Sequence, residues 1–205
     1  MGHMLAGHLI NSGYSSLTKP TMRNLEQQIT QYAAYHRDRR NIATHFVGVP
    51  MIVFSVILAL ANILIGPVHL GWIGVLTAAI YYLVLDRPLG FAMAFYLFMN
   101  AVLASLIAAY TSTVAGLGLA AACFIIGWAI QFVGHKYEGM KPAFVDDLIG
   151  LVIGPLFVMT ELFFIMGAKK QLKKYVEDRV GPVLAERNGA TIGPASHIGT
   201  VSHDA

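Results

Sequence analysis

The chain has 205 residues, of which 56% are hydrophobic and only 12% are charged, whereas soluble domains carry about 25% charged residues. Together with a mean hydropathy of +0.62, this composition excludes an ordinary soluble domain and predicts a single integral membrane domain. The net charge of +3 does not indicate a nucleic-acid partner, because the basic residues flank apolar segments as the positive-inside rule describes.

Both ends of the chain are predicted to lie outside that domain. Residues 1–20 contain Gly and Ser but no basic segment followed by an apolar core, so we expect a flexible leader and no signal peptide. Residues 181–205 are predicted to be a disordered tail, which leaves residues 21–180 as the membrane-embedded domain. The single cysteine, Cys123, excludes a disulfide framework.

Residues 21–40 form the first predicted helix. Thr21 is a suitable N-cap, and Leu25, Ile29 and Tyr32 recur at helical spacing. Because the remaining positions are polar or basic, we expect an amphipathic helix that lies on the membrane surface.

Four apolar segments follow that have the hydropathy of membrane spans. They cover residues 46–65, 70–85, 90–110 and 114–133. About 20 residues are needed to cross a hydrocarbon core of roughly 30 Å. Pro50 lies near the predicted start of the first span, where a proline ring is tolerated.

A fifth apolar segment, residues 148–167, is predicted not to cross. The N-terminal arm, the turn at 86–88, the polar segment 135–147 and the start of the tail at 169–174 all carry Lys or Arg. Four spans put all of these on one side, taken as cytoplasmic, whereas a fifth span would send the last of them to the other side. We therefore expect a re-entrant or interfacial hairpin bent near Gly154-Pro155, followed by an amphipathic C-terminal helix. The predicted class is an all-α integral membrane protein with about four transmembrane helices and this re-entrant or fifth helix.

This topology brings three histidines, His36, His45 and His135, to one membrane surface. Three imidazoles with carboxylates nearby and open positions suit non-haem Fe(II) or Zn(II). On one unbroken helix, His36 and His45 would be about 13.5 Å apart along the axis and would point to opposite sides. A shared ion therefore requires the helix to bend or stop near Asp38–Asn41. The alternative is an interfacial hydrogen-bonding role for each histidine.

Polar residues near these histidines are candidates for supporting or catalytic roles. Asn41, one turn before His45, could cap a new helix or orient a ligand. Gln131, one turn before His135, could hydrogen-bond its second ring nitrogen. Glu138 shares a helical face with His135 and is either a ligand or a solvated residue.

Further candidates lie beyond these two helices or carry positive charge. Asp146 could accept a hydrogen bond from a ligand or cap the next segment. Glu161 lies in an apolar stretch, so it should face a cavity, a basic partner or the site. Arg37, Arg40 and Lys141 could clamp a carboxylate or phosphate, or contact anionic lipid.

Two blocks of these residues also carry a family resemblance. They are Tyr35-His36, Asn41, His45 and Val49-Pro50, and then Ile126-Gly127-Trp128, the run 131–135, Glu138, Lys141-Pro142-Ala143, Asp146 and Glu161. The pattern, within about residues 25–175, resembles the membrane-embedded 2-hydroxy fatty acid dioxygenase family, known from the fungal endoplasmic-reticulum enzyme of phytosphingosine breakdown. The chain departs from the fungal pattern by one residue fewer between His135 and Glu138.

The resemblance implies a non-haem iron oxidoreductase with residues 21–180 as its catalytic domain. It would perform Fe(II)-dependent α-oxidation, in which a long-chain 2-hydroxy fatty acid and O₂ give CO₂ and the fatty acid one carbon shorter. His36, His45 and His135 are the implied iron ligands. The expected location is a bacterial inner membrane or the endoplasmic reticulum, with the lipid substrate in the bilayer and the site on the cytoplasmic face.

Two alternatives remain open. One is a zinc-dependent membrane lipid hydrolase with Glu138 as general base. The other is a non-enzymatic lipid-binding membrane protein, whose histidines could be replaced without loss of function.

Overall fold

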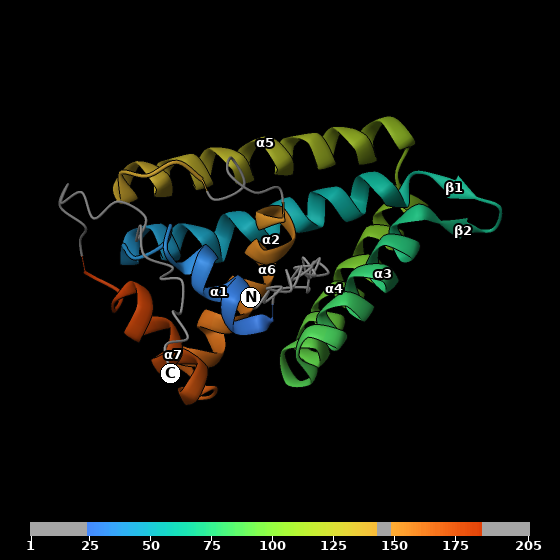
Figure 1. Cartoon of the computed structure of the whole chain (residues 1–205). Coiled ribbons are helices and arrows are strands. Elements are labelled where there is room, and N and C mark those ends of the chain that lie inside the picture. The colour runs from blue at the N-terminus through green and yellow to red at the C-terminus, as the bar shows by residue number, and fades with distance from the viewer. Residues whose placement is uncertain (1–23, 143–148, 186–205) are drawn as a thin grey trace, which may run out of the picture.

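A computed structural model describes residues 24–142 and 149–185, and within them the chain is almost entirely helical (Figure 1). The elements are α1 (Leu25–Ala33), α2 (Arg39–Ala61), β1 (Leu64–Ile65), β2 (Val68–His69), α3 (Leu70–Leu85), α4 (Arg87–Tyr110), α5 (Thr113–Glu138), α6 (Gly150–Ile165) and α7 (Lys170–Val180). This confirms the predicted all-α class. The predicted leader, the Thr21 cap, Asp146 and residues 186–205 lie outside the described residues.

Three helices, α2, α4 and α5, are long and apolar enough to cross a membrane, with 23, 24 and 26 residues. They correspond to the first, third and fourth predicted spans. Helix α3 has the bounds predicted for the second span, but its 16 residues extend only about 24 Å. Large apolar side chains on α4 face outward, and Phe91 and Phe95 are each 67% exposed. Such a surface suits lipid and not water.

The described part of the segment predicted as a re-entrant hairpin, residues 148–167, is almost entirely one helix, α6, which forms a bent pair with α7, and the expected position of the bend was wrong. Helix α6 continues through Gly154-Pro155, with Pro155 in its interior. The chain turns by 112° between α6 and α7. Gly167 and Lys169 have positive φ angles there, 76° and 53°, and left-handed residues of this kind commonly end helices.

Helix α1 also differs from its prediction. It begins at Leu25 behind an Asn24 capping box and ends at Ala33, well before residue 40. Its apolar face, which includes Ile29 and Tyr32, is buried against α6 and α7 and is not free to face lipid. Amphipathic spacing alone cannot distinguish these two environments, because protein and lipid both accept an apolar stripe.

Helices α2 and α5 lie side by side along most of their length (Figure 1). Glycines allow this approach: a Cβ on Gly127 would lie 2.8 Å from Ile52 Cγ1, and one on Gly48 would lie 2.8 Å from the Gly127 carbonyl oxygen. Because α2 begins at Arg39, Pro50 lies in the helix interior and not near its start as predicted.

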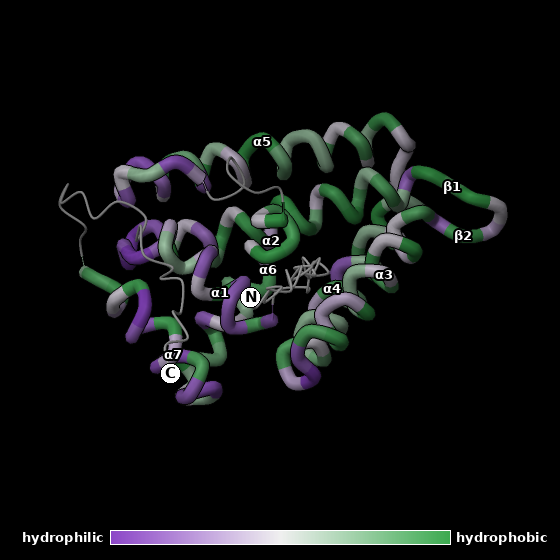
Figure 2. The backbone as a smooth tube through the Cα atoms, viewed as in Figure 1, coloured by the Kyte–Doolittle hydropathy of each residue, from purple (hydrophilic) through white to green (hydrophobic). Residues whose placement is uncertain are grey.

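Polar and apolar residues separate toward different parts of the fold (Figure 2). Hydrophilic residues gather on α1, α7 and the adjoining ends of α2 and α5, whereas β1, β2 and most of α3 and α4 are hydrophobic. Lys169 Nζ lies 2.6 Å from Asp86 Oδ2, so the turn between α3 and α4 meets the bend between α6 and α7. This contact favours a common side for the two basic segments at 86–88 and 169–174.

Candidate metal centre

The three predicted histidines meet in the interior, at the polar end of the α2–α5 pair. His36 lies in the turn between α1 and α2, His45 in the second turn of α2, and His135 near the end of α5. Their exposed fractions are 0%, 1% and 6%. One nitrogen from each ring lies within 4.8 Å of the others, and ring centroids are 4.4–5.3 Å apart.

A break in the helix makes this meeting possible, as the sequence required. Helix α1 ends at Ala33, and α2 begins at Arg39 after an extended Asp38. The Asp38 carboxylate caps α2 by accepting a hydrogen bond from Arg40 N at 2.8 Å. An acidic N-cap satisfies free backbone donors and complements the helix dipole. His36 therefore lies before the helix that carries His45 and can turn toward it.

Hydrogen bonds to backbone carbonyls orient two of the rings. Nδ1 of His36 lies 2.7 Å from Tyr32 O, and Nδ1 of His45 lies 2.9 Å from Asn41 O. A carbonyl oxygen only accepts, so each Nδ1 carries the hydrogen and each Nε2 carries a lone pair. Burial, followed by the neighbouring histidines, holds the pKa of His36 well below its usual range, which keeps this ring neutral.

The remaining ring nitrogens carry lone pairs that suit the coordination of a metal ion. Nε2 of His36 and Nε2 of His45 face each other at 3.0 Å. Two lone pairs cannot hydrogen-bond to each other, but both can coordinate one cation. Nδ1 of His135 is buried without a hydrogen-bond partner in the described structure, so a third ligand atom is available. Neutral imidazoles held by second hydrogen bonds are typical metal ligands.

Glu138 is close to this cluster but is engaged elsewhere. Its carboxylate is buried and accepts hydrogen bonds from Arg37 N at 2.9 Å, Asp38 N at 2.8 Å and Asn41 Nδ2 at 3.0 Å. Two donors from the α1–α2 connection and one from the first turn of α2 thus converge on one side chain of α5. Glu138 fixes the turn that carries His36 against the helix that carries His135.

Arg37 and Glu161 belong to a second buried arrangement behind the same turn. Arg37 Nη2 lies 3.8 Å from Glu161 Oε1, so Glu161 has the basic partner expected of a carboxylate in an apolar stretch. Arg37 also donates from Nε to His36 O and from Nη1 to Gly181 O, both at 2.9 Å.

Residues 181–185, at the start of the predicted disordered tail, pair with this turn. Arg39 N donates to Leu184 O at 2.9 Å, and Leu184 N donates to Arg37 O at 2.8 Å. The chain after α7 therefore holds the turn before α2 in place.

The other two candidate cations lie toward the surface. Arg40 Nη2 lies 2.8 Å from Asp38 Oδ2, and its guanidinium lies over the ring of Tyr137. Lys141 is exposed just after α5. Neither residue, nor Arg37, lines the pocket beside the histidines.

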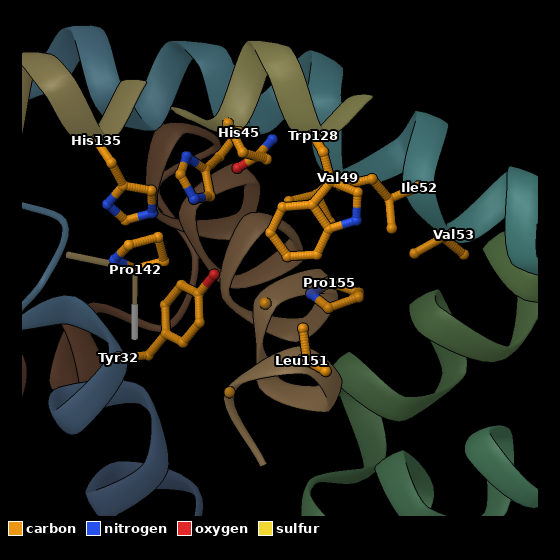
Figure 3. A pocket seen from close by; sticks show the side chains of 13 residues that line it. Tyr32, His45, Val49, Ile52, Val53, Trp128, His135, Pro142, Leu151 and Pro155 are labelled. Carbon is orange, nitrogen blue, oxygen red and sulfur yellow. The ribbon is translucent and has the colours of Figure 1, made fainter. Parts of the chain in front are cut away.

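That pocket lies between α2, α5 and α6 and contains about 480 Å³ of space, part of it open to the outside (Figure 3). At one end it is lined by His45, His135, Gln131, Tyr32 and Pro142. The rest of its wall is apolar: Val49, Ile52, Val53, Trp128, Leu151 and Pro155, with Gly150 and Gly154. The histidine cluster therefore opens into a groove that suits a hydrocarbon chain.

Two pocket residues were not predicted as part of the site, and one predicted contact is not formed. Trp128 appeared only in the family pattern, and Tyr32 was noted only for its helical spacing. The one signal for Tyr32 is its position four residues before His36. Gln131 directs its amide to Thr44 O at 3.5 Å and not to His135.

Known proteins resemble this chain in sequence. The sequence profile of the family described as Mpo1-like, 2-hydroxy-palmitic acid dioxygenase Mpo1-like, matches residues 22–166. The chain belongs to the Mpo1-like family. A member from Saccharomyces cerevisiae, 2-hydroxy-palmitic acid dioxygenase MPO1, is 34% identical over 158 residues, which cover 75% of this chain and 88% of the yeast protein. No solved structure matches the chain. The matched segment of the Mpo1-like profile includes all three histidines and every described pocket residue.

Proposed function

We propose that the protein is an Fe(II)-dependent dioxygenase that shortens a long-chain 2-hydroxy fatty acid by one carbon. The observation that carries the proposal is the buried cluster of His36, His45 and His135, with two lone pairs facing each other, at the head of an apolar groove. Membership of the Mpo1-like family and the name of the yeast relative support the reaction and the substrate class.

The proposed overall reaction is balanced without a further reductant. R–CH(OH)–COOH and O₂ give R–COOH, CO₂ and H₂O, so the bond between the carboxyl carbon and the α-carbon breaks. When bound, Fe(II) would supply the one-electron chemistry that O₂ needs to react with such a substrate. His36, His45 and His135 would hold this ion and leave positions open, as oxygen-activating sites require.

The protein's own residues bind and orient the substrate. Val49, Ile52, Val53 and Trp128 provide an apolar wall on which the acyl chain can lie, with its carboxylate and hydroxyl directed toward the histidines. Positioning of this kind supplies much of the rate in many enzymes. Because the groove excludes water from the acyl chain, it also limits side reactions at the head group.

The proposal includes a location in the membrane. The site would lie on the cytoplasmic face of a bacterial inner membrane or of the endoplasmic reticulum, since the basic segments adjoin the histidine end of the bundle. The acyl chain could then remain within the bilayer while its polar head reaches the site.

One experiment tests the chemistry directly. The purified protein is analysed for bound metals, and O₂ consumption is measured with 2-hydroxypalmitate. We expect bound iron, O₂ uptake and pentadecanoate as product, and loss of both iron and activity in His36→Ala, His45→Ala and His135→Ala. His69→Ala is the matched control, because His69 lies in β2 at the opposite end of α2.

Other outcomes identify the alternatives. Tightly bound zinc without O₂ uptake would favour a lipid hydrolase, although the three hydrogen bonds accepted by Glu138 leave it poorly placed as a general base. No turnover by the wild type, with lipid binding unchanged in all three alanine variants, would favour a non-enzymatic lipid-binding protein.

A further inference from the structure

Tyr32 is a pocket residue whose ring is held in place but whose hydroxyl is not. The ring stacks on His36 with parallel planes and centroids 4.3 Å apart, and it contacts Phe157 at 4.9 Å. Its hydroxyl points into the pocket beside His45 and His135 (Figure 3). Among the described residues this hydroxyl makes no hydrogen bond, whereas the hydroxyls of Tyr81 and Tyr82 bond to Gln28 and to Val152 O.

The pocket contains few groups that could receive a carboxylate. Its polar lining consists of His45, His135, Gln131 and Tyr32. The two histidines belong to the candidate metal cluster, and the Gln131 amide is directed at Thr44 O. The guanidinium of Arg37 is directed at Gly181 O and Glu161, away from this space. No Lys or Arg lines the pocket among the described residues.

We propose that Tyr32 is a substrate-binding residue whose phenol donates a hydrogen bond to the carboxylate of the fatty acid, an inference that rests on the proposed function. A phenol has an ordinary pKa of about 10, so it carries its proton at neutral pH and can donate. An ionised carboxylate accepts only and is the strongest acceptor on the substrate. Tyr32 therefore takes the position that the sequence suggested for a cation.

Gly154 preserves the space around this hydroxyl. A Cβ at residue 154 would lie 3.0 Å from Tyr32 Oη. The close approach of α6 to the phenol therefore depends on the absence of a side chain at this position. A methyl group there would press on the hydroxyl without touching any candidate metal ligand. This gives a second, independent way to disturb the same group.

The test uses the full-length protein in lipid nanodiscs and two readouts, palmitate binding and turnover of 2-hydroxypalmitate. Tyr32→Phe keeps the stacking ring and removes only the hydroxyl. We expect palmitate affinity and kcat/KM to fall about 10- to 100-fold, as for loss of a hydrogen bond to a charged group, with KM carrying most of the change. Bound metal should stay unchanged.

Tyr110→Phe is the control, because Tyr110 is 85% exposed at the end of α4 and should have no effect. Binding of 1,2-hexadecanediol, which has the hydroxyl but no carboxylate, should be equal in wild type and Tyr32→Phe. Gly154→Ala should also weaken palmitate binding and retain metal. If Tyr32→Phe folds poorly, Gly154→Ala tests the role of the Tyr32 hydroxyl in its place.

Different results would contradict the role of Tyr32 and the proposed dioxygenase activity. Unchanged palmitate affinity in Tyr32→Phe, or equal weakening of palmitate and diol, would overturn the role of Tyr32 even if the enzyme turns over normally. Absence of O₂ uptake by the iron-loaded wild type would overturn the dioxygenase, and the binding measurement would still decide whether Tyr32 receives a carboxylate.

Discussion

Glu138 links two parts of the site that are far apart in the sequence. Its two carboxylate oxygens receive the backbone N–H groups of Arg37 and Asp38 and the side-chain amide of Asn41. It is only 3% exposed. A buried carboxylate with three donors is well satisfied, but each donor would be left without a partner if the side chain were lost. Glu138 is therefore a positioning residue for His36 and His135.

Glu138→Gln is expected to loosen this connection without removing a ligand. A glutamine has only one acceptor oxygen, so its NH₂ group must face at least one of the three donors. We expect a loss of about 1–3 kcal/mol in the free energy of unfolding and metal affinity about 10- to 100-fold weaker. Denaturant unfolding in detergent and metal titration measure the two effects.

Glu177→Gln is the matched control for that substitution. Glu177 lies on α7, its side chain is 35% exposed, and its partner Lys173 lies 3.8 Å away. Exposed pairs of this kind contribute about 0–1 kcal/mol. If Glu138→Gln bound metal as tightly as the control, the positioning role would be wrong.

The sequence predicted the histidine cluster better than the residues that hold it in place. His36, His45 and His135 could be grouped because span counting brings all three to one surface. Glu138 was left open between ligand and solvated residue, because sequence shows a carboxylate but not the backbone N–H groups that face it. Likewise, the sequence does not show that Tyr32 lines a pocket, because that pocket forms only when α6 packs beside α2 and α5.

At the scale of elements, the site depends on how closely α2 and α5 approach. A Cβ on Gly134 would overlap Thr44 Oγ1 and lie 2.5 Å from Asn41 Oδ1. Gly134→Ala should therefore separate the helices next to His135. We expect a loss of about 1–3 kcal/mol together with reduced metal occupancy, measured by thermal unfolding and elemental analysis.

Gly118→Ala tests the same substitution on the same helix without the contact. Nothing lies within 4 Å of a Cβ at residue 118. Alanine has the higher helix propensity by about 0.8–1.0 kcal/mol, so this variant should be neutral or more stable. Equal destabilisation in the two variants would contradict the packing argument.

The apolar wall of the groove predicts selectivity for chain length. Val49 and Val53 follow His45 at one and two helical turns, so Val53 lies at the end of the groove away from the histidines. Val53→Trp should obstruct that end and lower kcat/KM for a 16-carbon 2-hydroxy acid at least tenfold more than for an 8-carbon one. Val47→Trp, at a position that is 53% exposed on the same helix, should leave the ratio unchanged.

The ends of helices were predictable where hydropathy changes sharply along the sequence. They were not predictable where the conformation of a local turn determines the end of the helix. The bounds of α3 follow from its apolar run, but Gly154-Pro155 was a poor guide to the bend. A proline inside a helix removes one hydrogen bond, and its ring crowds the carbonyl four residues before it, yet α6 continues through Pro155. The bend occurs instead at Gly167 and Lys169, where left-handed φ angles end α6.

At the scale of the whole molecule, the arrangement of charge predicts how the protein sits in a membrane. The hydrophilic ends of α2 and α5, together with α7, lie at one end of the fold, while β1 and β2 lie at the other (Figure 2). The contact of Lys169 with Asp86 joins the α3–α4 turn to the polar side. The spans α2, α4 and α5, with the shorter apolar helix α3 as a fourth crossing and α6 and α7 as a bent pair that does not cross, are compatible with both termini of the described chain on that side.

Single cysteines in a Cys123→Ser background test this arrangement. Asp178→Cys on α7, where the side chain is 57% exposed, reports the polar side. Leu64→Cys in β1, at a position that is 63% exposed, reports the opposite side. In sealed vesicles, an impermeant maleimide should label one position from outside and the other only after permeabilisation. In detergent both should react fully, which controls for local reactivity. If both positions were labelled from the same side, residues Leu64–Ile65 and α7 would share a membrane face, and the arrangement of spans argued from the distribution of charge would be wrong.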